Sequence, residues 1–139
     1  MTSAVDTNVI VSLWDADVSN VAARDALEAA LSRGTVVVSG AVYAELMGGV
    51  GRTSDMLDEF FGDTGILVDW AMDRIIWERA GSAYRGYLGR RRKSHAAAPK
   101  SMMADFLIGA HASRHGYALV TLDRRVLRAA FPELTIIDA

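Results

Sequence analysis

The sequence predicts an α/β protein with a short, mainly parallel sheet of about five strands flanked by helices. Two observations predict this class. Short apolar runs recur along the chain, and segments of helical composition separate them; this alternation is typical of crossover units that join parallel strands. The chain has 139 residues, 51% of them hydrophobic and 23% charged. That is long enough to bury one core, so we expect a single domain over residues 1–139.

The five strand candidates are short apolar runs in which several residues are β-branched. Since helical segments lie between them, the connections cross over and the strands run mainly parallel, with both faces of the sheet covered. In order, the candidates are residues 4–5 with the residues before them, 35–38, 65–68, 118–121 and 134–137.

Three longer segments are predicted to be helical. Residues 20–31 are rich in alanine and leucine and end near Gly34, a common helix stop. Residues 72–88 carry apolar side chains at helical spacing, and residues 102–115 end before Gly116. The run at residues 48–51 (GGVG) marks a break between two helices, and residues 94–100, with Pro99, form a loop before a helix.

Composition excludes several classes of site. Without cysteine, the chain has no disulfide, thiolate metal site or cysteine nucleophile. The net charge is -2, so any basic surface for nucleic acid must be local. No apolar run reaches the roughly 18 residues that a membrane span needs, and no secretory signal is present. We therefore expect a soluble, cytoplasmic protein with no membrane partner.

Carboxylates recur where the predicted strands end. In a parallel α/β sheet, ligands bind outside the carboxyl ends of the strands. All four acids could therefore reach one edge of the sheet. They are Asp6 after the first strand, Glu45 in the helix after the second, Asp105 opening the helix before the fourth, and Asp123 after the fourth.

Four carboxylates in one pocket repel one another and stay ionised together only with cations between them. An all-oxygen set suits a hard cation such as Mg²⁺ or Mn²⁺. Such ions can activate water and neutralise the charge that builds on a phosphate. The pattern thus indicates phosphodiester hydrolysis without a covalent intermediate.

Four stretches resemble the PIN-domain nucleases, and within them the VapC-type toxins of toxin-antitoxin pairs. They occur in the order of that family and cover essentially the whole chain. The most specific pairing is DFLIGAHA followed by LVTLD. The four stretches are AVDTNVIV at residues 4–11, GAVYAELMGG at 40–49, ADFLIGAHA at 104–112 and ALVTLD at 118–123.

The resemblance implies a PIN-like three-layer fold and a metal-dependent endoribonuclease. It implies that Asp6, Glu45, Asp105 and Asp123 bind Mg²⁺ or Mn²⁺ and that the protein cuts RNA with a metal-activated water. It also implies a homodimer and a cognate antitoxin that inhibits the enzyme. One departure is the absence of an aromatic residue shortly after Asp123, where Val126 or Leu127 can take the apolar role.

Each acid also has a purely structural interpretation. Asp6 could cap a helix, and Asp105 could complement a helix dipole. Glu45 could lie on a solvated helix face, and Asp123 could belong to a turn. These accounts explain single residues, whereas a shared metal explains the set.

Other polar residues are predicted to support the site. Asn8 and Thr121 are expected to hold a neighbouring carboxylate or the backbone in place. The run Arg90, Arg91, Arg92 and Lys93 is either a solvated helix end or a contact for an RNA backbone, with Lys100 as a further cation. His111 and His115 are one helical turn apart, but no third ligand is apparent in the sequence, so we expect both to be structural or solvated.

The alternative function is a non-catalytic PIN-like module that binds RNA or a protein without cutting. Phosphoryl transfer through an aspartyl-phosphate would need a second acid two residues after Asp6, where Asn8 stands. No glycine-rich phosphate-binding motif follows the first strand, which disfavours a nucleotide-binding fold. Cleavage of RNA into defined fragments would separate the nuclease from the binding module.

Overall fold

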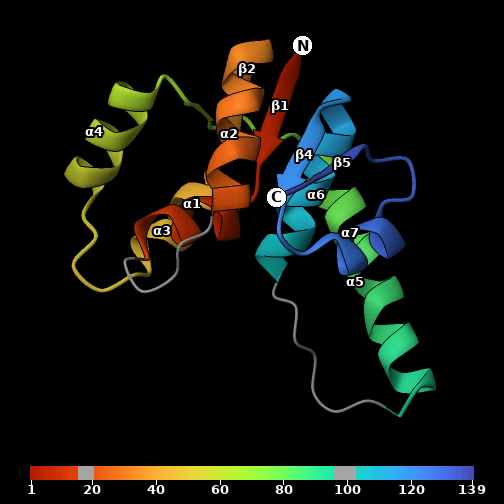
Figure 1. The fold of residues 1–139 in the computed structure, drawn as a ribbon. Coiled ribbons are helices and arrows are strands. Elements are labelled where there is room, and N and C mark those ends of the chain that lie inside the picture. The colour runs from red at the N-terminus through yellow and green to blue at the C-terminus, as the bar shows by residue number, and fades with distance from the viewer. Residues whose placement is uncertain (16–20, 96–102) are drawn as a thin grey trace.

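The computed structural model describes residues 1–15, 21–95 and 103–139. Its centre is a sheet of five parallel strands in the order β3-β2-β1-β4-β5. Figure 1 labels four of them, β1, β2, β4 and β5. This architecture confirms the predicted fold class. The strands are β1 (Thr2–Val5), β2 (Thr35–Ser39), β3 (Leu67–Asp69), β4 (Ala118–Thr121) and β5 (Ile136–Asp138).

Helices connect consecutive strands throughout. The strand order moves one way from β1 to β3 and the other way from β3 to β5. Since parallel crossovers are right-handed, the helices before β3 and those after it cover opposite faces of the sheet. They are α1 (Thr7–Trp14), α2 (Val21–Arg33), α3 (Gly40–Met47), α4 (Ser54–Thr64), α5 (Arg74–Lys93), α6 (Met103–His115) and α7 (Arg124–Ala130).

The hydrophobic core lies around β1, the central strand. Ala4 and Val5 of β1 are buried together with Val36 and Val38 of β2, and β4 is buried along its whole length. Such strands are covered on both faces, as a parallel sheet requires. Among the described residues, no helix combines the length and the apolar character needed to cross a membrane.

Helix α5 is longer than the sequence predicted. It begins after Asp73, whose side chain accepts the N–H of Ile76 at 2.9 Å, and it runs to Lys93 instead of ending at Leu88. Gly89 disfavours helix, but the three arginines after it favour helix, and their charges are favourable near the C-terminal end of α5. Of the loop predicted after it, residues 96–100 lie outside the described residues, as do Asn20 and Met102, the first residues of two predicted helices.

The contact between α6 and α7 depends on Gly109. A Cβ atom at this position would lie 2.5 Å from the ring of Phe131 and 3.0 Å from Leu127. Both of these side chains are buried. Leu127 therefore takes the apolar role expected after Asp123, and Phe131, just beyond α7, supplies an aromatic ring to the same contact.

Candidate metal centre and its surroundings

The acidic site lies at the ends of β1 and β4, where the strand order changes direction. A crevice forms outside the carboxyl ends of parallel strands at such a point. Asp6 follows β1 directly, and its N–H donates to the carbonyl oxygen of Val120 in β4 at 2.9 Å. This bond continues the pairing of the two strands and fixes the backbone of Asp6 at the crevice.

The side chain of Asp6 is held by Thr121, the last residue of β4. The Thr121 hydroxyl donates to Asp6 Oδ2 at 2.8 Å, and both residues are buried. The same hydroxyl accepts the N–H of Asp123 at 3.0 Å. Asp6 precedes α1 at the N-cap position, but its side chain makes no capping hydrogen bond. The capping alternative therefore does not account for this carboxylate.

Glu45 reaches the site from α3. The hydroxyl of Thr7, the first residue of α1, donates to Glu45 Oε1 at 2.6 Å. The hydroxyl of Thr7 thus orients the carboxylate of Glu45, just as the hydroxyl of Thr121 orients that of Asp6. The sequence interpretation did not assign this role to Thr7, because its partner is 38 positions away along the chain.

Asp105 lies in the first turn of α6. Carboxylate oxygens of Asp6, Glu45 and Asp105 lie within 4.8 Å of one another, although the three acids come from different crossover units. A first-turn acid also complements the helix dipole, but that alternative does not explain why the other two acids converge on it.

Burial and the two neighbouring acids perturb Asp6. The pKa of Asp6 is raised from 3.8 to about 6, mainly by burial. The hydrogen bond from Thr121 lowers it, and the charges of Asp105 and Glu45 raise it. A cation among the three oxygens would reverse both unfavourable effects, because it replaces lost solvation and neutralises the repulsion.

The donor set fits a hard divalent cation such as Mg²⁺ or Mn²⁺. All three protein ligands would be carboxylate oxygens, the ligand type that such ions prefer. A further oxygen is the hydroxyl of Ser39, the last residue of β2, which lies beside β1. This hydroxyl is buried and has no hydrogen-bond partner among the described residues. Buried hydroxyls normally have a partner, so an ion-bound or ordered water would satisfy it.

Asp123 and Asn8 lie beside this group. Asp123 is exposed at the start of α7, and its carboxylate is not among the three that converge. Asn8 Oδ1 accepts the N–H of Leu122 at 3.2 Å, which ties α1 to the turn after β4. Asn8 thus contacts backbone, whereas Thr121 contacts a carboxylate directly.

The basic run is placed on the last turn of α5. This end of the helix projects away from the sheet (Figure 1). Arg92 and Lys93 are exposed, and the guanidinium of Arg91 lies 5.7 Å from the ring centre of Tyr87. Arg90 instead lines a pocket of about 310 Å³ between α5 and the segment that follows α7.

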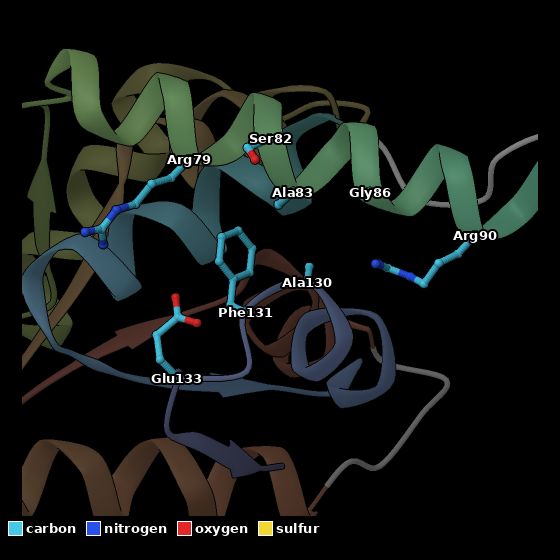
Figure 2. A pocket seen from close by; sticks show the side chains of 8 residues that line it. All are labelled: Arg79, Ser82, Ala83, Gly86, Arg90, Ala130, Phe131 and Glu133. Carbon is cyan, nitrogen blue, oxygen red and sulfur yellow. The ribbon is translucent and has the colours of Figure 1, made fainter.

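Figure 2 shows that pocket with Arg90 at one end and Arg79 with Glu133 at the other. The Arg79 guanidinium donates to Ser113 Oγ at 3.3 Å, and Ser113 in turn donates to Glu133 at 2.6 Å. The Ser113 hydrogen bond is the main reason that the pKa of Glu133 is lowered. Arg79 and Glu133 are thus connected through Ser113 at one end, whereas Arg90 faces the other end.

Comparison with known proteins agrees with this architecture. The family model described as the PIN domain matches residues 4–132. A chain of the VapBC2 complex from Rickettsia felis, bound to a promoter DNA fragment, superposes with a TM-score of 0.62 at 21% identity, covering 100% of this chain and 99% of that one. None of the curated proteins matches the sequence.

Two further solved structures have the same fold. A chain of a toxin-antitoxin complex from Klebsiella pneumoniae gives a TM-score of 0.66 at 20% identity, with coverage of 97% and 95% of the two chains. A chain of VapBC-1 from nontypeable Haemophilus influenzae gives 0.66 at 19% identity, with coverage of 99% and 98%. The predicted fold and family are therefore confirmed, and the chain belongs to the PIN domain family.

Proposed function

We propose that this protein is a metal-dependent endoribonuclease and acts as the VapC-type toxin of a toxin-antitoxin pair. The observation that carries the proposal is the convergence of Asp6, Glu45 and Asp105 at the ends of β1 and β4. Asp6 is buried beside two other acids, and burying a carboxylate among like charges raises the free energy of the folded protein, so the cluster needs a compensating role. A cation-binding catalytic centre in a PIN domain supplies that role.

In this proposal Asp6, Glu45 and Asp105 hold Mg²⁺ or Mn²⁺, and Asp123 contributes from the exposed side of the same centre. When bound, the ion supplies a Lewis acid that activates water and stabilises charge on the phosphate. Thr7 and Thr121 keep two of the carboxylates oriented through their hydroxyls. Asn8 fixes α1 against the turn after β4.

The proposed substrate is RNA held by its phosphate backbone. The run from Arg90 to Lys93 offers four cations on the last turn of α5, and arginine binds phosphate in a bidentate manner. Because the net charge of the chain is -2, such a local basic surface would have to offset the general repulsion between protein and RNA.

The proposed partners are a cognate antitoxin and a second copy of this chain. Support comes from the structural neighbours, which were solved as toxin-antitoxin complexes. An apolar pocket of about 350 Å³ lies between α1 and α4, where Arg52 stacks over Trp14. We propose it as an antitoxin contact, and we propose that residues 1–139 form one PIN domain acting in the cytoplasm.

Exposed apolar side chains further define where partners could bind. On α3 and α4, Val42 and Leu46 are buried in the core, Leu57 lines the pocket just described, and Met47 and Met56 are exposed. A second exposed set lies on β3, on α5 and on the segment between them, and it is a candidate surface for the second copy. It consists of Leu67, Trp70, Ile75 and Trp77.

The decisive experiment is cleavage of total RNA by the purified protein with Mg²⁺, with Mn²⁺ or with chelator, followed by mapping of new ends. Defined ends that require metal and disappear in Asp105→Asn would establish the nuclease. Asp63→Asn, which neutralises an exposed acid on α4, is the matched control and should cleave normally. RNA binding without any cleavage would instead identify a binding module.

A further inference from the structure

A second group of potential metal ligands lies outside the acidic site. It consists of Asp69 at the end of β3 and of His111 and His115, one turn apart on α6. One ligand atom from each lies within 4.8 Å of the other two. The sequence showed the histidine pair but no third ligand, because Asp69 is 42 positions before His111.

Both imidazoles direct the same type of nitrogen at one carboxylate oxygen. His111 Nε2 lies 2.8 Å from Asp69 Oδ2, and His115 Nε2 lies 4.0 Å from the same oxygen. The other oxygen of Asp69 accepts the N–H of Ala71 at 3.0 Å. The carboxylate is thereby fixed by its own backbone and offers its remaining oxygen to the two histidines.

The rings are held in place by their neighbours. The ring of His115 stacks on Tyr117 with centroids 5.2 Å apart and an interplanar angle of 20°. His111 makes an edge contact with His115 at 5.1 Å and is 1% exposed. The His115 side chain is 34% exposed, so the group is closed on the His111 side and open to solvent on the other.

The charges around the group favour a cation. The hydrogen bond from His111 is the main reason that the pKa of Asp69 is lowered, so this carboxylate stays ionised. The nearby cation Arg114 is engaged elsewhere, since its Nε donates to Asp73 Oδ2 at 3.0 Å. Among the ion pairs of the described residues, Asp69 pairs with these two histidines and with no arginine or lysine.

We propose that Asp69, His111 and His115 form a binding site for a transition-metal ion of the Zn²⁺ type, separate from the acidic centre. Two imidazole nitrogens and one carboxylate oxygen with an open position facing solvent are a ligand set that Zn²⁺ accepts and Mg²⁺ does not favour. Bond lengths of about 2.0–2.1 Å in a tetrahedral site separate ligand atoms by about 3.3 Å. The separations of 2.8 Å and 4.0 Å between the histidine nitrogens and Asp69 Oδ2 bracket that value, so modest side-chain shifts suffice.

An ion at this site would join β3 to α6 beyond the existing hydrogen bond. Asp69 precedes the connection to α5, and His115 ends α6 just before β4. A metal bridge between them would stabilise the folded chain, because the unfolded chain does not hold the three ligands together. The proposal does not rest on nuclease activity and can be tested without RNA.

The test is calorimetric titration of the full chain with Zn²⁺ in saturating Mg²⁺, repeated with three variants. His115→Gln removes the exposed ligand, so it avoids disturbing the core. Asp6→Asn weakens the acidic centre, and His95→Gln removes the remaining histidine, which is exposed. We expect one strong Zn²⁺ site in the wild type, Asp6→Asn and His95→Gln, and an affinity at least tenfold weaker in His115→Gln.

Spectroscopy of bound Co²⁺ gives a second measurement. The wild type should develop the strong visible absorption of a low-coordinate site with nitrogen ligands, and His115→Gln should lose it while melting normally in chelator. Affinity should also fall as the pH is lowered, because protons compete for the imidazoles. The proposal is overturned if His115→Gln binds Zn²⁺ like the wild type, if Asp6→Asn abolishes the strong site, or if the wild type binds no Zn²⁺.

Discussion

Thr121 and Asp6 are joined by a buried hydrogen bond of 2.8 Å between residues 115 positions apart. The bond links the ends of β1 and β4 at the point where the acidic centre opens. It also lowers the pKa of Asp6, against the raising effects of burial and of the other two acids. One hydroxyl therefore contributes both to the fold and to the charge state of the site.

Thr121→Val should reveal both contributions of this hydroxyl. The change keeps the side-chain shape, removes the donor to Asp6 and leaves the N–H of Asp123 without its acceptor. We expect the free energy of unfolding to fall by about 1–3 kcal/mol and the pKa of Asp6 to rise further. Thr121→Ser, which keeps the hydroxyl, is the control. Denaturant melts and carboxyl titration by NMR measure both effects, and unchanged values in Thr121→Val would refute this role.

The raised pKa of Asp6 predicts how stability changes with pH in metal-free protein. Between about pH 4 and 6 the folded chain binds this proton more tightly than the unfolded chain, so the free energy of unfolding falls as pH rises through that window. A shift from 3.8 to about 6 corresponds to a destabilisation of up to about 3 kcal/mol above pH 6. Asp6→Asn lacks this ionisation. In chelator, its free energy of unfolding should therefore fall less steeply between about pH 4 and 6 than that of the wild type.

Added Mg²⁺ should stabilise the folded protein and so oppose the loss of stability caused by ionised Asp6. Above pH 6 it should raise the melting temperature of the wild type. The free energy of unfolding should increase by about 2.7 kcal/mol when the Mg²⁺ concentration is about 100 times Kd. Below pH 6 the effect should fade because protons compete for Asp6. The response of Asp6→Asn should be smaller, and that of Asp63→Asn should match the wild type. Equal responses in Asp6→Asn and the wild type would remove Asp6 from the ligand set.

Gly109→Ala should destabilise the protein despite the better helix propensity of alanine. The added methyl group would meet the Phe131 ring at 2.5 Å, and overpacking of this kind costs about 1–3 kcal/mol against a propensity gain of at most about 1 kcal/mol. Gly81→Ala on α5 is the control, because nothing lies within 4 Å of its added Cβ. Thermal melts should show opposite shifts, and a stabilised Gly109→Ala would contradict the close contact.

Replacing Arg90, Arg91 and Arg92 by Gln should weaken RNA binding and reduce its salt dependence. For single-stranded RNA the slope of log K against log salt should fall by roughly 0.7 for each lost phosphate contact. Exposed Arg24 and Arg33 on α2 serve as the control. Filter binding across a salt series measures the slope. A slope equal to the wild type would mean that the run is only the solvated end of α5.

The fold could be predicted because its signals are local. Short apolar runs alternate with helical segments, and this pattern alone yields the parallel sheet. The end of α5 was misplaced, since a run of arginines after Leu88 can end a helix or extend it, and local propensity decides only weakly between the two.

The side-chain pairings within the site were harder to predict from the sequence, because they join residues far apart along the chain. Acids at strand ends pointed to a shared edge, and the structure brings three of them together. Nothing local in the sequence distinguishes Asp123, whose carboxylate lies outside that group, from the other three. The partnerships of Thr7 with Glu45 and of Asp69 with His111 depend on how the helices pack, which the spacing of residues does not specify.

The positions of the acidic-centre residues along the chain determine when the centre can form during translation. Its carboxylates come from residues 6, 45 and 105, and the hydroxyl that anchors the first of them comes from residue 121. A growing chain on the ribosome therefore holds no assembled centre until β4 has emerged. If the centre cuts RNA as proposed, the newly made protein cannot cut the message that encodes it before β4 has been synthesised.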